Sequence, residues 1–135
     1  MQNHNRRKFI ASLAAIGAVV SGFSFRSTTK MKKKVLSHHV FFWLKNPDSK
    51  EDLAKLIQGL DSLRKIETIR GLQIGVPAST EKRDVVDNSF SVSELMFFDD
   101  VAGQNTYQDH PLHKKFIEDC SHLWEKVIVY DAMEV

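Results

Sequence analysis

Hydrophobic and polar residues alternate along some stretches of the chain and recur at helical spacing along others. Val35–Leu44 and Phe90–Phe98 are rich in aromatic and β-branched residues, which is typical of β-strands. Residues 48–66 repeat leucine and isoleucine every three or four positions after a capping residue, Asp48 or Ser49, which predicts an amphipathic helix. Strands and helices are both expected.

The rest of the pattern predicts two further strands and a second amphipathic helix. A short strand is expected in "LQIGVPA", residues 72–78, with Gly71 at the junction between helix and strand. Val101–Gln108 is weakly helical, and Pro111 suits the first turn of the next helix. The apolar stripe of that helix is Leu112, Phe116, Ile117, Cys120 and Leu123. Residues 124–135 close the chain as a strand.

The order β-α-β-β-α-β is that of the ferredoxin-like α+β fold, in which two helices lie on one face of a four-stranded antiparallel sheet. Side chains alternate between the two faces of a strand. The outward face of the first strand consists of Ser37, His39, Phe41 and Trp43. Soluble proteins rarely expose a large apolar surface. We therefore predict a homodimer, in which each buried Phe or Trp contributes roughly 1.5–3 kcal/mol.

The first 30 residues have the layout of an export signal. Arg6 and Arg7 precede an uncharged apolar run, residues 9–25, and resemble the bacterial twin-arginine type. The run is short for a membrane span. We expect residues 1–30 to be a signal peptide and linker, cleaved between Ser21 and Lys30 on export to the periplasm, and residues 31–135 to form one domain with no stable membrane span. An uncleaved anchor, or translation that starts after the run, is the alternative.

Composition narrows the function classes. Residues 1–30 hold five of the 19 Lys and Arg and none of the 17 Asp and Glu, so residues 31–135 carry 14 bases against 17 acids, a net charge near −3. Nucleic-acid binding would require a basic face, so we expect no nucleic-acid partner. The lone Cys120 can form no internal disulfide and is predicted to be a small core residue.

Several short motifs occur in an order and spacing that resemble a known family. The first strand contains HHVFFWLK, residues 38–45, the next strand follows IRGLQIG, residues 69–75, and the second helix begins with HPLH, residues 110–113. Together they resemble the Dabb family, the stress-responsive dimeric α/β barrels, over nearly all of residues 35–135. The ending WEKVIVYD, residues 124–131, is similar to that of the plant olivetolic acid cyclase branch. The resemblance implies two sheets packed face to face.

For this branch, the resemblance implies a hydrophobic pocket between helices and sheet, in which a histidine and a tyrosine perform acid-base chemistry. The HPLH motif assigns these roles to His113 and Tyr107. The other residues expected at the pocket are His38, Phe42, Glu94, Val127 and Val129. Val92 stands where the branch has a histidine, and Glu94 where it has an aliphatic residue. A carboxylate in the wall alters which acyl chain could enter without leaving a buried charge unpaired.

The same residues allow non-catalytic roles. His110 and His113 could satisfy backbone groups at the start of a helix, with Tyr107 as a wall residue. Glu94 could be an acid-base group whose pKa is raised by desolvation, or it could pair with a lysine or a backbone amide. A zinc site would combine the two histidines with a third ligand, from among His38, Glu94 and His122. We expect no metal.

No dinucleotide glycine loop or haem-ligation motif occurs in the sequence, so we expect no cofactor. The sequence predicts cofactor-free acid-base chemistry of the cyclase, isomerase or lyase type on a small hydrophobic carbonyl compound. The alternative is a non-catalytic, stress-associated protein that binds a ligand or has a structural role. Cofactor-free oxygen chemistry stays open by analogy of fold alone.

Overall fold

The computed structural model describes residues 33–135, and the predicted export signal lies outside the described residues. Two short 3-10 helices follow α1 and α3. In chain order the elements are β1 (Leu36–Leu44), α1 (Lys50–Ser62), η1 (Leu63–Lys65), β2 (Ile69–Gly75), β3 (Val92–Phe98), α2 (Val101–Asp109), α3 (Pro111–Cys120), η2 (Ser121–Leu123) and β4 (Trp124–Met133).

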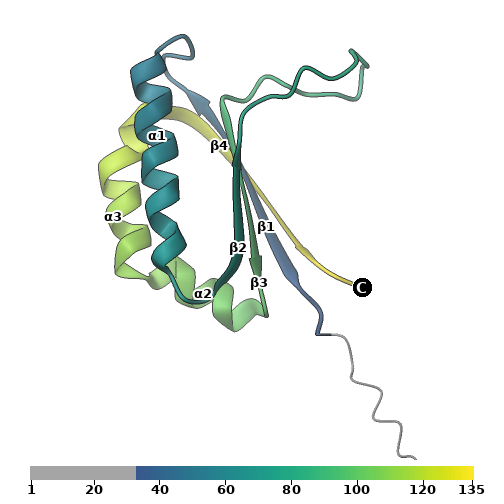
Figure 1. Cartoon of the computed structure of the whole chain (residues 1–135), viewed down its shortest axis with the longest axis vertical. Coiled ribbons are helices and arrows are strands. Elements are labelled where there is room, and N and C mark those ends of the chain that lie inside the picture. Colours follow the sequence, from purple (N-terminus) through teal and green to yellow (C-terminus); the bar gives the residue numbers. More distant parts are fainter. Residues whose placement is uncertain (1–32) are drawn as a thin grey trace, which may run out of the picture. The chain divides into compact units, whose positions relative to one another are not determined.

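The strands form one antiparallel sheet in the order β2-β3-β1-β4. Figure 1 shows α1, α2 and α3 on one face of this sheet. The predicted ferredoxin-like α+β fold is confirmed, with the second helical region divided into α2 and α3. Within the described part of the chain, no helix has the length and apolar character needed to cross a membrane.

Local sequence explains where the helices begin. The hydroxyl of Ser49 caps α1 by accepting a hydrogen bond from the amide of Asp52 at 3.1 Å. Pro111 begins α3, because its fixed φ angle suits the first helical turn. His110 separates α2 from α3 with an extended backbone and accepts a hydrogen bond from the Leu112 amide through Nδ1, at 3.1 Å. His110 therefore has the non-catalytic role given above as an alternative, in which it satisfies a backbone group at the start of a helix.

The junction between the first helix and the second strand differs from the prediction. The pattern places Gly71 at this junction, but in the structure Gly71 lies inside β2, which begins at Ile69. The register between β2 and β3 shifts between these two residues, so Gly71 occupies an irregular point of the ladder. The predicted helix over residues 48–66 also ends earlier, because its last turn tightens into η1.

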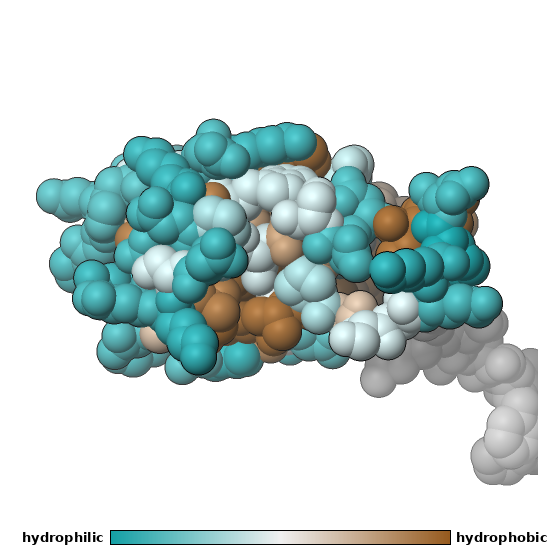
Figure 2. Space-filling model, turned by 90° about the horizontal axis from the view of Figure 1, so that it is seen from above, coloured by the Kyte–Doolittle hydropathy of each residue, from teal (hydrophilic) through white to brown (hydrophobic). Residues whose placement is uncertain are grey.

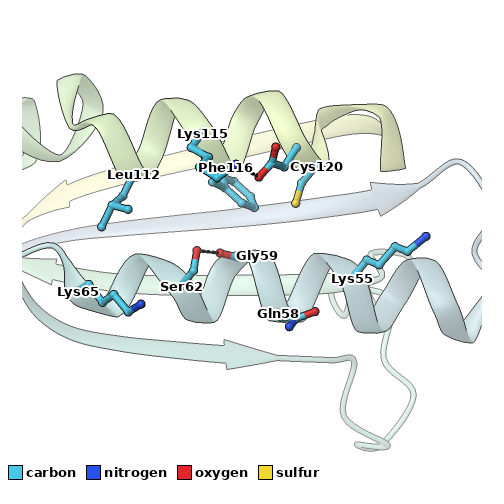
Figure 3. Close-up of a pocket in the computed structure, with 10 residues that line it drawn as sticks. Lys55, Gln58, Gly59, Ser62, Lys65, Leu112, Lys115, Phe116 and Cys120 are labelled. Carbon is cyan, nitrogen blue, oxygen red and sulfur yellow. Dashed lines mark hydrogen bonds and ion pairs between the residues drawn. The ribbon is translucent and has the colours of Figure 1, made fainter.

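The core lies between the helices and the covered face of the sheet, where alternate residues of β1 and β3 are buried. The helices α1 and α3 pack closely at Gly59. Figure 3 shows this glycine opposite Phe116 and Cys120 of α3. A Cβ atom at position 59 would lie 2.6 Å from the Cys120 Sγ atom. Glycine is therefore needed for helix contact, which offsets its cost of about 1 kcal/mol in a helix.

Figure 1 shows no helix of residues 33–135 on the other face of the sheet. This face carries several aromatic side chains. The Phe41 ring centroid lies 5.0 Å from that of Phe90 and 6.1 Å from that of Tyr130. The Lys126 ammonium group lies 4.4 Å from the centroid of the Trp43 ring. We call this surface of β1, β3 and β4 the open face. It is the face for which the sequence predicts a second copy.

The connection between β2 and β3, residues 76–91, extends past the end of the sheet (Figure 1). Its tip, residues 79–84, has the sequence STEKRD and is exposed. Figure 2 shows mainly hydrophilic side chains at this end of the molecule. The base of the loop is tied to the open face, because Trp43 Nε1 donates a hydrogen bond to Ser89 Oγ at 3.0 Å.

Candidate active site

The seven residues predicted for the site lie around one cavity of about 180 Å³. This cavity lies between α2 and α3 and the covered face of β1, β3 and β4. Cavities of about 150 Å³ can bind benzene, so this one has room for a molecule of about that size. The predicted residues in its wall are His38, Phe42, Glu94, Tyr107, His113, Val127 and Val129. Five further residues, which were not predicted for the site, complete the cavity wall: Val40, Gln108, Phe116, Ile117 and Trp124.

The register of the edge strand β4 explains where the cavity opens. Val127 lies opposite Phe42, and Val129 lies opposite Val40, so both valines share the helical face of the sheet. They are nevertheless 43% and 46% exposed, because the helices leave the edge strand partly uncovered. The cavity therefore opens along β4 and is deepest beside β3.

His38 forms a carboxylate–imidazole pair with Asp131. The two residues are direct partners in the β1–β4 ladder, and His38 Nδ1 lies 2.6 Å from Asp131 Oδ1. The carboxylate accepts this hydrogen bond, so Nδ1 carries the proton. The His38 side chain is buried, whereas that of Asp131 is half-exposed at the edge. In the neutral imidazole, Nε2 is then left as an acceptor.

His113 enters the cavity wall from the first turn of α3. Its Nδ1 donates a hydrogen bond to the backbone carbonyl of Gln108 at 3.1 Å, so Nε2 keeps its lone pair. Burial lowers the pKa of His113 below its usual 6.5, and the nearby His38 lowers the pKa further. At neutral pH the imidazole is therefore an uncharged base.

Tyr107 of α2 lies between these two histidines. Its ring centroid is 5.7 Å from that of His38 and 4.5 Å from that of His113. The residue is 1% exposed. Burial raises the pKa of Tyr107 far above its usual range, with a smaller contribution from the charge of Glu94. The phenol therefore keeps its proton and can only donate it in a hydrogen bond.

Glu94 is the deepest ionisable side chain of the cavity. It is 1% exposed, and its ladder partners are two apolar residues, Val40 on β1 and Ile74 on β2. Its Oε1 atom is buried without a hydrogen-bond partner in the described structure. Burial raises the pKa of Glu94 from 4.5 to about 8. At neutral pH the side chain is therefore mostly the uncharged acid.

The model of the Dabb family, described as the Stress responsive A/B Barrel Domain, matches residues 36–134. The chain belongs to the Dabb family. The match includes every strand and helix given above, so the whole cavity lies within the Dabb domain. No curated protein is similar enough in sequence to count as a match.

Solved structures with the same fold include other Dabb proteins. A Dabb family protein from Mesorhizobium loti is 25% identical, with a TM-score of 0.61, over 76% of this chain and 98% of its own. The hydroxynitrile lyase from Passiflora edulis is 19% identical, with a TM-score of 0.65, over 77% of this chain and 96% of its own. A dimeric ferredoxin-like protein of unknown function from Thermobifida fusca is 15% identical, with a TM-score of 0.60, over 75% and 92%.

The two departures of this Dabb domain from the predicted family pattern lie in different places. Val92 is completely buried in the core and is not part of the cavity wall. Glu94 lies in the wall, next to two other ionisable side chains of the cavity, Tyr107 and His38. Only the second departure therefore changes the chemistry available inside the Dabb cavity.

The two histidines of the HPLH motif lie in different surroundings in the Dabb domain. His113 lines the cavity, whereas His110 does not, and its Nε2 lies 3.9 Å from a carboxylate oxygen of Glu67. The two histidines therefore do not face one common site. Among residues 33–135, no cluster of three or more His, Cys, Asp or Glu side chains is placed to hold a metal ion.

A larger groove of about 450 Å³ lies on the outer side of the Dabb domain, along α1 and α3 (Figure 3). Two of its lysines are paired on their own helices, Lys55 with Glu51 and Lys115 with Asp119. The described residues place no unpaired buried polar atom in its wall. The smaller cavity with its histidines and Glu94 is therefore the stronger candidate for chemistry.

Proposed function

We propose that this Dabb domain catalyses cofactor-free acid-base chemistry of the lyase, isomerase or cyclase type on a small hydrophobic carbonyl compound. The observation that carries the proposal is the neutral imidazole of His113, which lies 4.5 Å from the Tyr107 ring in the wall of one apolar cavity. A base and a donor at one small cavity are what proton transfer next to a carbonyl group requires.

The chemical step follows from the states of these two groups. His113 Nε2 takes the proton from the carbon next to the carbonyl, and the electrons of that C–H bond move to the carbonyl oxygen to form an enolate. The Tyr107 hydroxyl donates a hydrogen bond to the oxygen as its charge develops. The protonated His113 then returns the proton to the same or another carbon. His38 is positioned by Asp131 at the side of the cavity.

Hydrogen–deuterium exchange at the methyl group of acetophenone in D₂O, followed by NMR, tests the step without knowledge of the natural substrate. The wild-type protein is expected to accelerate this exchange, and His113→Ala to lower the protein-dependent rate by about 100-fold, which is typical of losing a general base. His122→Ala is the matched control, because His122 is exposed and lies outside the cavity. Exchange that His113→Ala leaves unchanged would contradict the proposal.

A non-catalytic binding protein is the second candidate, and the hydrogen bond from His113 to the Gln108 carbonyl favours it. In this case His113 fixes the turn between α2 and α3. The wild-type protein would then give no exchange above the buffer rate, and His113→Ala would only lower the melting temperature. The same two measurements on one variant therefore separate the candidates.

We further propose that the protein is a homodimer that pairs through the open face. Two observations support this: the aromatic side chains there, and the dimeric state in which the ferredoxin-like protein from Thermobifida fusca is described. A second sheet packed on this face would remove its apolar surface from water.

Export is also part of the proposal, and it is supported by the arginine pair before the apolar run. Replacing Arg6 and Arg7 together by lysine is expected to keep the protein in the bacterial cytoplasm, because the twin-arginine route reads this pair. Fractionation of cells with N-terminal sequencing of the periplasmic protein measures both export and cleavage. Undiminished periplasmic protein from the double variant would exclude the twin-arginine route.

A further inference from the structure

Glu94 is a deeply buried polar group that the fold itself does not satisfy. Its side chain lines the deep end of the cavity, is 1% exposed, and has an Oε1 atom without a hydrogen-bond partner among residues 33–135. Burying such a group unpaired destabilises a protein, so nearly all buried polar groups have partners. A hydrogen-bond partner from outside the chain would therefore remove this destabilisation.

The groups around Glu94 define what that partner could be. Its ladder partners on β1 and β2 are apolar, and the ionisable groups beside the cavity are His38 of β1, Tyr107 of α2, His113 of α3 and Asp131 of β4. Asp131 is occupied by His38, and none of these groups donates to the free oxygen of Glu94. Burial raises the pKa of Glu94 to about 8, so at neutral pH its hydroxyl can donate a hydrogen bond.

We propose that Glu94 and Tyr107 form a two-donor site for the carbonyl oxygen of an uncharged substrate about the size of one ring, with Glu94 setting the specificity. The inference rests on the proposed function and names its substrate class. Both side chains lie in the wall of one cavity, both are 1% exposed, and the described chain leaves the Oε1 atom of Glu94 without a partner. A tyrosine beside a neutral carboxylic acid forms the oxyanion hole of enzymes that isomerise ketones.

The size of the cavity and the hydrogen-bonding groups in its wall exclude other classes of ligand. A cavity of about 180 Å³ is too small for a long acyl chain, and its walls are mainly apolar. A hydrocarbon would fill it but leave Glu94 and Tyr107 unpaired. Sites built to hydrogen-bond a polar group discriminate strongly against analogues that lack this group. The expected preference is therefore for a neutral carbonyl compound over a hydrocarbon of equal shape.

Acetophenone and α-methylstyrene form a matched pair of probes, because they have the same planar shape and differ in having a carbonyl oxygen or a methylene group. Binding to the full-length folded protein is measured by NMR titration at pH 7. The wild-type protein is expected to bind acetophenone at least about tenfold more tightly, which corresponds to about 1.4 kcal/mol. Equal affinity for the two probes would overturn the inference.

Two substitutions show whether Glu94 is responsible. Glu94→Leu is expected to reduce the preference for acetophenone, because only the Tyr107 donor then remains in the cavity wall. Glu94→Gln is expected to keep most of it, because the amide still donates. Acetophenone affinity of the wild-type protein is also expected to fall as the pH rises above about 8, whereas that of Glu94→Gln stays constant. A preference that Glu94→Leu leaves at the wild-type value would overturn the inference and assign the free oxygen to a bound water instead.

The result stays distinct from the test of catalysis. His113→Ala is expected to lose deuterium exchange but to keep the preference for acetophenone, because its base is gone and both donors remain. Exchange in the wild-type protein with no effect of Glu94→Leu on binding would overturn the inference and leave the proposed function intact. A preference for acetophenone that depends on Glu94, in a protein that catalyses no exchange, would support the inference and overturn the proposed function.

Discussion

Glu94→Leu is expected to raise the free energy of unfolding by roughly 3–5 kcal/mol at pH 8. The folded protein holds a proton on Glu94 up to a pKa of about 8, whereas the unfolded chain releases it above 4.5. The unfolded state therefore binds fewer protons between these values, and wild-type stability falls by about 1.4 kcal/mol per pH unit as the pH rises. Leucine removes both this linkage and the unpaired buried oxygen.

Denaturant unfolding at fixed protein concentration measures this effect across a pH series. The useful window is pH 7–8, because the pKa values of His113 and His39 are lowered in the folded state and their opposite contribution, stability that rises with pH, levels off above the unfolded-state pKa of 6.5. Glu94→Gln is the control for packing, since it keeps the shape but cannot titrate. A wild-type stability that runs parallel to that of Glu94→Gln across this window would show that Glu94 has no raised pKa.

The gain in stability expected from removing Glu94 also bears on its role. A residue that costs stability in the core is retained at functional sites, where its chemistry outweighs the cost. The stabilised Glu94→Leu variant is expected to be the one whose preference for a carbonyl ligand is reduced. Stability and ligand preference should therefore change in opposite directions at this position.

Alternation along the strands predicts which strand residues share the helical face of the sheet, whereas the pocket on that face is implied by the family resemblance. A period of two places His38 and Phe42 on one face of β1 and Glu94 on the matching face of β3. The apolar stripe of the second helix places His113 toward the same face. The assignment of Tyr107 came from the family resemblance, because the weak pattern of α2 does not indicate which of its faces is buried.

The parts that prediction missed depend on register and on exact pairing. Asp131 lies opposite His38 only because β4 pairs with β1 in one particular register, and a shift of one residue would turn it to the open face. Gly71 lies inside a strand because the ladder of β2 and β3 is irregular there. Neither feature has a local signal, since both arise from contacts between strands far apart in the chain. The sequence allows a lysine or a backbone amide as the partner of Glu94, but only the structure shows that its Oε1 atom is unpaired among residues 33–135.

Phe41→Glu is expected to convert the proposed homodimer to a folded monomer. Phe41 lies in the middle of the aromatic cluster of the open face, near the rings of Phe90 and Tyr130. In a twofold dimer the substitution occurs in both copies, so two carboxylates would lose water in the interface. Burying an unpaired charge costs several kcal/mol. Because the face is accessible in the monomer, the fold itself should survive.

Sedimentation velocity at micromolar concentration measures the change, with circular dichroism as the check on folding. The experiment is best done at pH 8, because the pKa of His39 is lowered by burial and the neutral ring then cannot pair with the new carboxylate beside it. Gln58→Glu is the matched control, since it adds the same charge to the exposed surface of α1. If the wild-type protein sediments as a monomer, or if Phe41→Glu still dimerises, the open face is not a dimer interface.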